Sequence, residues 1–144
     1  MSTLCIDIGN TSSHFGCVHA QGVSQRGQFP TNLLQQSANK TILEQLAPLI
    51  ADCDSVAFCS VVPDANKKLQ QALLAYNLPI FQLDHLSCRG LTLAYPTPEE
   101  IGQDRLANAI AAQANYGTPA IVIDLGTAVT FDIITSRGYE GGLI

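Results

Sequence analysis

Two segments of the chain end an apolar run with an aspartate, a glycine and hydroxyl-bearing residues. They span residues 4–16 and 121–132. A tight turn of this composition points backbone N–H groups and hydroxyls outward, and this arrangement suits a phosphate group. A carboxylate at the same place would repel an anion unless a cation lay between them. Asp7 and Asp124 are therefore candidate cation ligands.

The two segments match each other when Asn10 is treated as an insertion. The match then pairs Gly9 with Gly126, Thr11 with Thr127, Phe15 with Phe131 and Gly22 with Gly138. Glycine lets a backbone approach phosphate closely, and hydroxyl donors are available at Thr11, Ser12, Ser13 and Thr127. One such segment alone favours an ordinary β-turn. The matched pair favours a duplicated fold that holds a nucleotide between two lobes.

A third candidate lies between these segments, at Gly102-Gln103-Asp104-Arg105. An aspartate can accept the proton of an alcohol, and the planar fork of an arginine can hold a carboxylate or a phosphate. The alternative is structural. Asp104 would then cap a helix over residues 106–114, and Arg105 would be a solvated surface charge.

The elements that must position these residues follow from apolar periodicity and from turn signals. Short strands are expected at residues 3–9, 13–20, 23–29, 55–62 and 79–83. One helix is expected over residues 31–51, with an interruption near Pro48, and a second helix after Pro63, capped by Asp64. A third helix is expected over residues 104–114, before Gly117. A hairpin of two strands follows residue 118. This order predicts an α/β protein with a mixed sheet. Its first lobe would span residues 1–116 and a second lobe would begin at 117.

Composition limits the possible partners. The net charge is -5, and no basic patch with interleaved aromatic residues occurs, so nucleic acid is not an expected ligand. No apolar run approaches the ~18 residues of a membrane span, and the chain starts directly with a strand, so neither a membrane segment nor a signal peptide is expected. Five cysteines without metal-binding spacing suit reduced, mostly buried thiols in the cytoplasm.

Four motifs occur in a fixed order, namely Asp7-Ile-Gly-Asn-Thr11, Gly102-x-Asp104-Arg105, Asp124-Leu-Gly-Thr-Ala128-x-Thr130-x-Asp132 and Gly141-Gly142-x-Ile144. Together they resemble the type III pantothenate kinases of the acetate and sugar kinase/Hsp70/actin superfamily. The resemblance implies an actin-like, ribonuclease H-like ATPase fold. It also implies ATP-dependent phosphorylation of pantothenate to 4'-phosphopantothenate, the first step of coenzyme A biosynthesis.

The resemblance implies a role for each matching position. The ATP phosphate loop would comprise Asp7, Ile8, Gly9, Asn10, Thr11, Ser12, Ser13 and His14, with Asp7 near Mg²⁺. Pantothenate would contact Tyr95, Gly102, Gln103, Asp104 and Arg105. Asp104 would accept the proton of the substrate hydroxyl, Asp124 would bind a monovalent cation (K⁺ or NH₄⁺), and Thr127 would contact ATP.

Two other functions stay open at this point. One is a non-catalytic ATP- and pantothenate-binding or regulatory protein of the same fold, and the other is a kinase that acts on another small alcohol. Family members are longer, so the resemblance implies a complete first lobe, a truncated second lobe and a homodimer in the full-length protein. The activity of this chain alone is therefore an open question.

Overall fold

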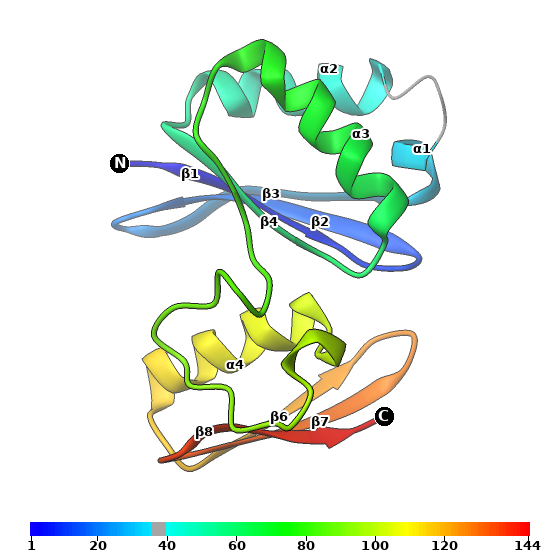
Figure 1. The fold of residues 1–144 in the computed structure, drawn as a ribbon. Coiled ribbons are helices and arrows are strands. Elements are labelled where there is room, and N and C mark those ends of the chain that lie inside the picture. Colours follow the sequence, from blue (N-terminus) through cyan, green and yellow to red (C-terminus); the bar gives the residue numbers. More distant parts are fainter. Residues whose placement is uncertain (36–39) are drawn as a thin grey trace. The chain divides into compact units, whose positions relative to one another are not determined.

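The computed structural model describes residues 1–35 and 40–144 (Figure 1). The chain divides into two compact units, Met1–Gln82 and Leu83–Ile144. Each unit has its own hydrophobic core, and each is described by itself. In the described part of the chain, no helix has the length and apolarity that crossing a bilayer requires.

The first unit contains a five-stranded mixed sheet with the order β3-β2-β1-β4-β5. Its strands are β1 (Thr3–Ile8), β2 (Ser12–His19), β3 (Gly22–Pro30), β4 (Ser55–Ser60) and β5 (Ile80–Gln82). β1 pairs antiparallel with β2 and parallel with β4. This arrangement confirms the predicted mixed sheet.

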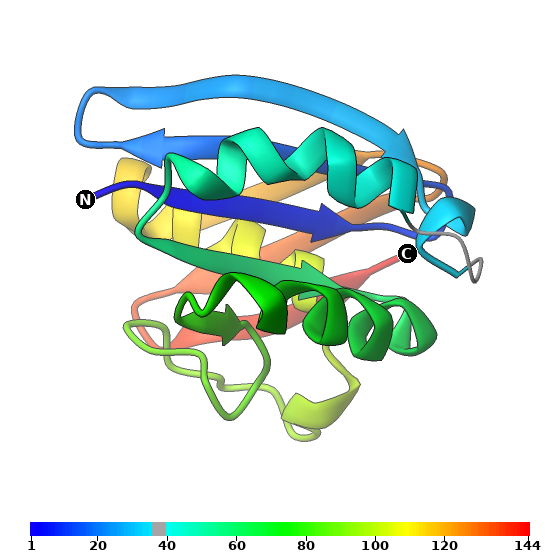
Figure 2. The same ribbon diagram turned by 90° about the horizontal axis from the view of Figure 1, so that it is seen from above.

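Helices α1 (Asn32–Gln35), α2 (Lys40–Ala51) and α3 (Pro63–Leu73) cover one face of this sheet, and a short 3₁₀ helix, η1 (Leu74–Tyr76), follows α3 (Figures 1 and 2). Side chains alternate along β1, so Leu4, Ile6 and Ile8 point into the core beneath the helices. Cys5 and Asp7 lie on the opposite face. The helical pattern predicted over residues 31–51 corresponds to α1 and α2, and residues 36–39 lie outside the described part.

The predicted helix cap at Asp64 is wrong. The N-cap residue of α3 is Val62, and Pro63 occupies the first turn. Proline suits this position because a backbone N–H in the first turn of a helix has no partner within the helix, so nothing is lost when proline lacks it. Asp64 instead lies one residue further on, where its charge is favourable near the positive end of the helix. Pro48 lies within α2, which continues to Ala51.

The second unit contains a three-stranded antiparallel sheet, β6 (Ala120–Leu125), β7 (Val129–Thr135) and β8 (Gly138–Leu143). The prediction of two strands after residue 118 was therefore incomplete. The third strand was missed because its glycines are typical of turns rather than of strands. Helix α4 (Gln103–Tyr116) packs on one face of this sheet, after a short 3₁₀ helix, η2 (Pro98–Glu100) (Figure 1).

The division into compact units falls after Gln82. The lobe boundary between residues 116 and 117 stays a prediction. Leu106 and Ala109 of α4 are buried in one cluster with Ile134 of β7 and Tyr139 of β8. Burial of these apolar side chains joins α4 to the sheet that follows it in sequence.

The strand pairing confirms the duplication seen in the sequence. In the first copy Ile8 pairs with Ser13 around residues 9–12, and in the second Leu125 pairs with Val129 around residues 126–128. The first loop is thus longer by the single residue that the alignment required. The repeat also includes a third strand, because the β2–β3 turn ends at Gly22 and the β7–β8 turn ends at Gly138.

The two copies differ in what covers them. Leu4, Ile6 and Ile8 are 0, 2 and 0% exposed, whereas the matching Ile121, Ile123 and Leu125 are 68, 56 and 78% exposed. In the second copy α4 instead covers the face that carries Ala120 and Val122. The sheet of the second unit therefore has one packed face and one exposed apolar face.

All five cysteines are free thiols, in agreement with the sequence-based expectation. Cys17 and Cys53 are buried side by side, with sulfur atoms 3.6 Å apart. Burial raises the pKa of the Cys17 thiol to about 11, which keeps it protonated near neutral pH.

Candidate active site

The loop between β1 and β2 is held from below by a residue that the sequence did not single out. The Thr31 hydroxyl donates to the Gly9 carbonyl at 2.7 Å, and the Thr31 N–H donates to the Thr11 carbonyl at 3.0 Å. The Gly9 N–H donates across the turn to the Ser12 carbonyl at 3.2 Å. The exposed tip, with Asn10 and Thr11, thus sits on a fixed base. A threonine directly after a strand was the only sequence signal for Thr31.

The predicted phosphate-loop residues divide between this base and the exposed tip. Ser13 is 0% exposed and its hydroxyl lies 2.8 Å from that of Thr31. Because the Thr31 proton goes to Gly9, Ser13 donates to Thr31. Its hydroxyl therefore supports the loop from inside. Ser12 and His14 contact each other, with Oγ and Nε2 3.2 Å apart, and the His14 side chain is exposed.

Asp7 lies at the end of β1 on the face opposite the core. The Cys59 thiol donates to Asp7 Oδ1 at 3.3 Å. Ile8, the next residue, is fully buried and contributes only its backbone to this edge. The structure thus places the Asp7 carboxylate beside the base of the loop, where a hard cation could be bound.

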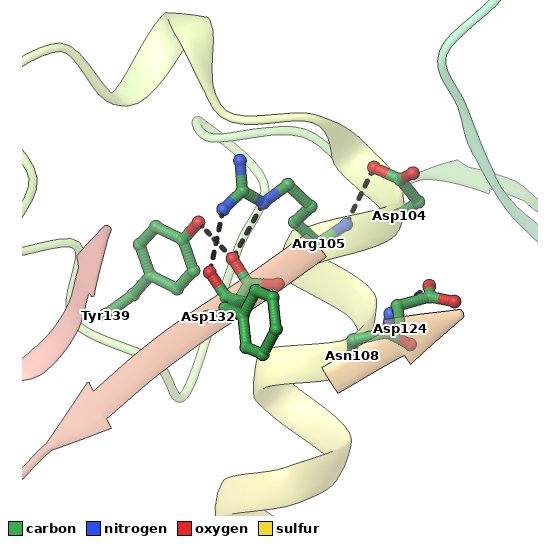
Figure 3. A network of polar contacts seen from close by, with 7 residues as sticks. Asp104, Arg105, Asn108, Asp124, Asp132 and Tyr139 are labelled. Atoms are coloured by element: carbon green, nitrogen blue, oxygen red, sulfur yellow. Dashed lines mark hydrogen bonds and ion pairs between the residues drawn. The ribbon is translucent and has the colours of Figure 1, made fainter. Parts of the chain in front are cut away.

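The second hairpin carries Asp124 at the corresponding position. Asn108 of α4 donates through Nδ2 to Asp124 Oδ2 at 3.0 Å (Figure 3). Asn108 follows Asp104 by one helical turn and belongs to none of the sequence motifs. The Gly126 N–H donates to the Ala128 carbonyl at 3.1 Å and closes the turn, and Thr127 is exposed at its tip.

Asp104 lies in the first turn of α4, but the N-cap residue is Gly102. Asp104 Oδ1 accepts the Arg105 N–H at 2.8 Å, and this contact holds the carboxylate over the helix N-terminus (Figure 3). A Cβ at position 102 would lie 2.5 Å from Oδ1, so the carboxylate occupies space that only glycine leaves open. Among the described residues, Asp104 Oδ2 has no hydrogen-bond partner. It remains available as a proton acceptor.

Arg105 is not a solvated surface charge. Its side chain is 14% exposed, and its Nε donates to Asp132 Oδ1 at 2.7 Å. Its Nη2 donates to the Phe131 carbonyl at 3.2 Å. Figure 3 shows the guanidinium held against β7 by these two contacts.

Two tyrosines complete this cluster. The Tyr139 hydroxyl donates to Asp132 Oδ1 at 2.6 Å, and Asp132 is 0% exposed. Burial, together with this hydrogen bond, raises the pKa of Tyr139 well above its ordinary value, so the hydroxyl keeps its proton. The predicted substrate residue Tyr95 meets Tyr139 edge to face, with ring centroids 6.4 Å apart.

The second unit thus brings together Tyr95, Gly102, Asp104 and Arg105 with three residues that the predicted site omitted, Asn108, Asp132 and Tyr139. Asp124 joins them through Asn108. The first unit separately holds Asp7 and the loop to His14. Gln103 begins α4 beside Asp104 and is half-buried.

Comparison with known proteins decides the family. A family model described as type III pantothenate kinase matches residues 3–144. The chain belongs to this family. Relatives named type III pantothenate kinase include one from Akkermansia muciniphila, 37% identical over 100% of this chain and 57% of its own length. One from Streptomyces avermitilis is 33% identical over 98% of this chain and 58% of its own length.

Solved structures agree on the fold. A Ppx/GppA phosphatase from Aquifex aeolicus matches with a TM-score of 0.60 at 11% identity, over 99% of this chain and 51% of its own. A putative sugar kinase from Cytophaga hutchinsonii matches with a TM-score of 0.55 at 14% identity, over 96% of this chain and 49% of its own. The predicted α/β, actin-like fold class is thereby confirmed. This type III pantothenate kinase family member spans about half the length of the relatives that it matches.

Proposed function

We propose that the protein transfers the γ-phosphoryl group of ATP to the primary hydroxyl of pantothenate, and that Asp104 is the general base. Family membership supports the substrates. One observation supports the base, which is that the Asp104 carboxylate is fixed at the start of α4 through one oxygen and keeps the other available. As further parts of this proposal we include a homodimer for the full-length protein and a cytoplasmic location.

In the proposed reaction the substrate oxygen forms a bond to the γ-phosphorus while the bond from that phosphorus to the β-phosphate oxygen breaks. ADP leaves, and the hydroxyl proton passes to Asp104. Phosphoryl transfer depends mainly on positioning and on charge stabilisation. The turn of residues 9–12, on its Thr31 base, would offer N–H and hydroxyl donors to the phosphates, and Thr127 would offer another donor.

The acidic positions fit hard cations. Asp7 and Asp124 present carboxylate oxygens, the ligands that Mg²⁺ and K⁺ prefer. In the described part of the chain no three His, Cys, Asp or Glu side chains converge as a metal cage, so phosphate oxygens and water would complete each site. The cations, when bound, would neutralise charge on the phosphates. In this proposal Asp7 serves Mg²⁺ and Asp124 serves the monovalent cation.

The test is pantothenate-dependent ADP release by this chain with Mg²⁺, with and without K⁺. Asp104→Asn should lower kcat by about 10²–10⁴-fold, the usual contribution of a general base. Asp64→Asn is a matched control, since both aspartates follow the first residue of a helix. It should remove a similar helix-terminal charge and leave turnover unchanged.

Each outcome has a defined meaning. Near-normal turnover in Asp104→Asn would contradict the base assignment. Binding of ATP and pantothenate without turnover in the parent chain would favour the binding or regulatory alternative. Turnover with other small alcohols at equal efficiency would favour the third alternative, a kinase of different substrate choice.

A further inference from the structure

Asp132 is a fully buried carboxylate that the proposed chemistry does not use. Its Oδ1 accepts from Arg105 Nε at 2.7 Å and from the Tyr139 hydroxyl at 2.6 Å. Its Oδ2 is buried and has no partner among the described residues. Burying a carboxylate is costly unless it is paired, so the charge of Asp132 depends on Arg105 and Tyr139. A buried carboxylate oxygen without a partner is rare in folded proteins, and a functional role is one explanation for it.

The two contacts of Arg105 fix its orientation. The guanidinium carries five N–H donors in one plane. Nε is held by the Asp132 carboxylate and Nη2 by the Phe131 carbonyl, both on β7. Two acceptors on one strand prevent the guanidinium from rotating. Among the described residues Nη1 has no partner, so its end of the fork is left for a ligand (Figure 3).

The glycine pair of β8 makes room for this arrangement. A Cβ on Gly142 would clash with Arg105 Nη2 and with the Phe131 carbonyl oxygen. A Cβ on Gly141 would lie 2.8 Å from the Tyr95 ring. The two predicted substrate contacts, Tyr95 and Arg105, thus each pack against one glycine of the Gly141-Gly142 motif.

We propose that Asp132 is a positioning residue that holds the Arg105 guanidinium with its Nη1 end directed to pantothenate. Tyr139 fixes the same carboxylate oxygen from the other side, and Gly142 provides the space. The identity of the ligand rests on the proposed function. The orientation of Arg105 by Asp132 does not, and it can be measured separately.

The first experiment is a double-mutant cycle on kcat/KM for pantothenate. Asp132→Asn should lower kcat/KM by about 10²-fold, chiefly through KM, because a misplaced binding group costs about this much. Arg105→Lys removes the fork but keeps a positive charge beside Asp132. In that background Asp132→Asn should cost less than about 2-fold, because it acts through the fork. Glu140→Gln removes a carboxylate on the neighbouring strand β8 from its ion pair with Arg137, and it should leave kcat/KM unchanged.

The second experiment does not require turnover. In a ¹⁵N NMR spectrum of this chain, the Arg105 Nε–H proton should exchange slowly with water, unlike that of the exposed Arg89. Asp132→Asn should accelerate its exchange by at least about 10-fold, the effect of losing a charge-assisted hydrogen bond of ~1.5–3 kcal/mol. Should Asp132→Asn fail to fold, Tyr139→Phe replaces it, because this change removes the other donor to Oδ1 and keeps the ring.

The outcomes separate the two proposals. A parent chain with slow Arg105 exchange and neither pantothenate binding nor turnover contradicts the proposed function and supports the orientation of Arg105. Fast Arg105 exchange in the parent chain overturns the positioning role. So does an Asp132→Asn loss that is equally large in both Arg105 backgrounds, because that result indicates a general structural defect.

Discussion

The Thr31 hydroxyl donates to the Gly9 carbonyl at 2.7 Å and so ties the start of the first helical region to the turn between β1 and β2. Ser13 in turn donates to Thr31 at 2.8 Å. Thr31 and Ser13 are both 0% exposed, so water cannot replace either bond. Three segments of the first unit therefore share one buried hydroxyl.

Thr31→Val is expected to destabilise the protein, because it keeps the shape of the side chain and removes the hydroxyl. The Gly9 carbonyl and the Ser13 hydroxyl lose their partner, at a cost of about 2 kcal/mol in the free energy of unfolding. Urea unfolding measures this change. The same substitution at the exposed Thr118 should stay within about 0.5 kcal/mol, and an equal effect at both sites would contradict the role given to Thr31.

Gly102→Ala is expected to impair turnover more than stability. The new Cβ would lie 2.5 Å from Asp104 Oδ1 and push the carboxylate away from its place over the helix N-terminus. The backbone at Gly102, with φ -55°, accepts alanine without strain. We expect kcat for ADP release to fall by about 10²-fold with the unfolding midpoint nearly unchanged. Full activity in this variant would show that the position of Asp104 is unimportant.

The Asp84 carboxylate is expected to contribute to the free energy of unfolding in a pH-dependent way. Its Oδ1 accepts the N–H groups of Ser87 at 2.7 Å and Leu86 at 2.9 Å. Chiefly through the Ser87 bond, these contacts lower the pKa of Asp84 below its ordinary value of 3.8. A lowered folded-state pKa means that the stabilisation is present above the unfolded pKa and is lost as pH falls through the folded one.

Asp84→Asn should therefore be less stable than the parent by about 1 kcal/mol at pH 7, the difference between a charged and a neutral acceptor. The gap should close as pH is lowered from about 5 to 2, where the parent carboxylate becomes protonated. Urea unfolding across this range is the measurement. A gap that stays constant down to pH 2 would mean that the charge of Asp84 is irrelevant.

Equivalent positions of the two hairpins should respond differently to one substitution. Ile6 is 2% exposed and its counterpart Ile123 is 56% exposed. Ile6→Thr buries a hydroxyl in the core and should cost about 3 kcal/mol, whereas Ile123→Thr should stay within about 0.5 kcal/mol. Ile123→Thr should also reduce the binding of a hydrophobic dye such as ANS. Equal destabilisation at both sites would show that Ile123 is covered in solution.

Local patterns predicted the strands well. The alternation of Leu4, Ile6 and Ile8 identifies the buried face of β1, and the insertion at Asn10 identifies the longer of the two turns. Both features depend on residues close together in sequence. Strand β8 was not predicted, because Gly141 and Gly142 have no side chains that could show an alternating apolar pattern.

The polar cluster was beyond sequence reasoning for another reason. Arg105 meets Asp132 across 27 residues, and Thr31 meets Gly9 across 22. Nothing in the residues around Arg105 indicates whether its side chain faces solvent or a buried carboxylate such as Asp132. The motifs marked Asp132, Gly141 and Gly142 as part of a pattern, but only the fold shows that all three surround Arg105 and Tyr95.

The parallel pairing of β1 with β4 also has a consequence for the order in which the chain folds. Thr3 and Ser55, partners across these strands, are 52 residues apart, whereas β6, β7 and β8 are joined by consecutive tight turns. Closing a long loop costs more entropy than closing a short one, and non-local pairing slows folding. The hairpin of β1 and β2 can therefore form early by itself, while the sheet of the first unit is complete only after β4 arrives beside it.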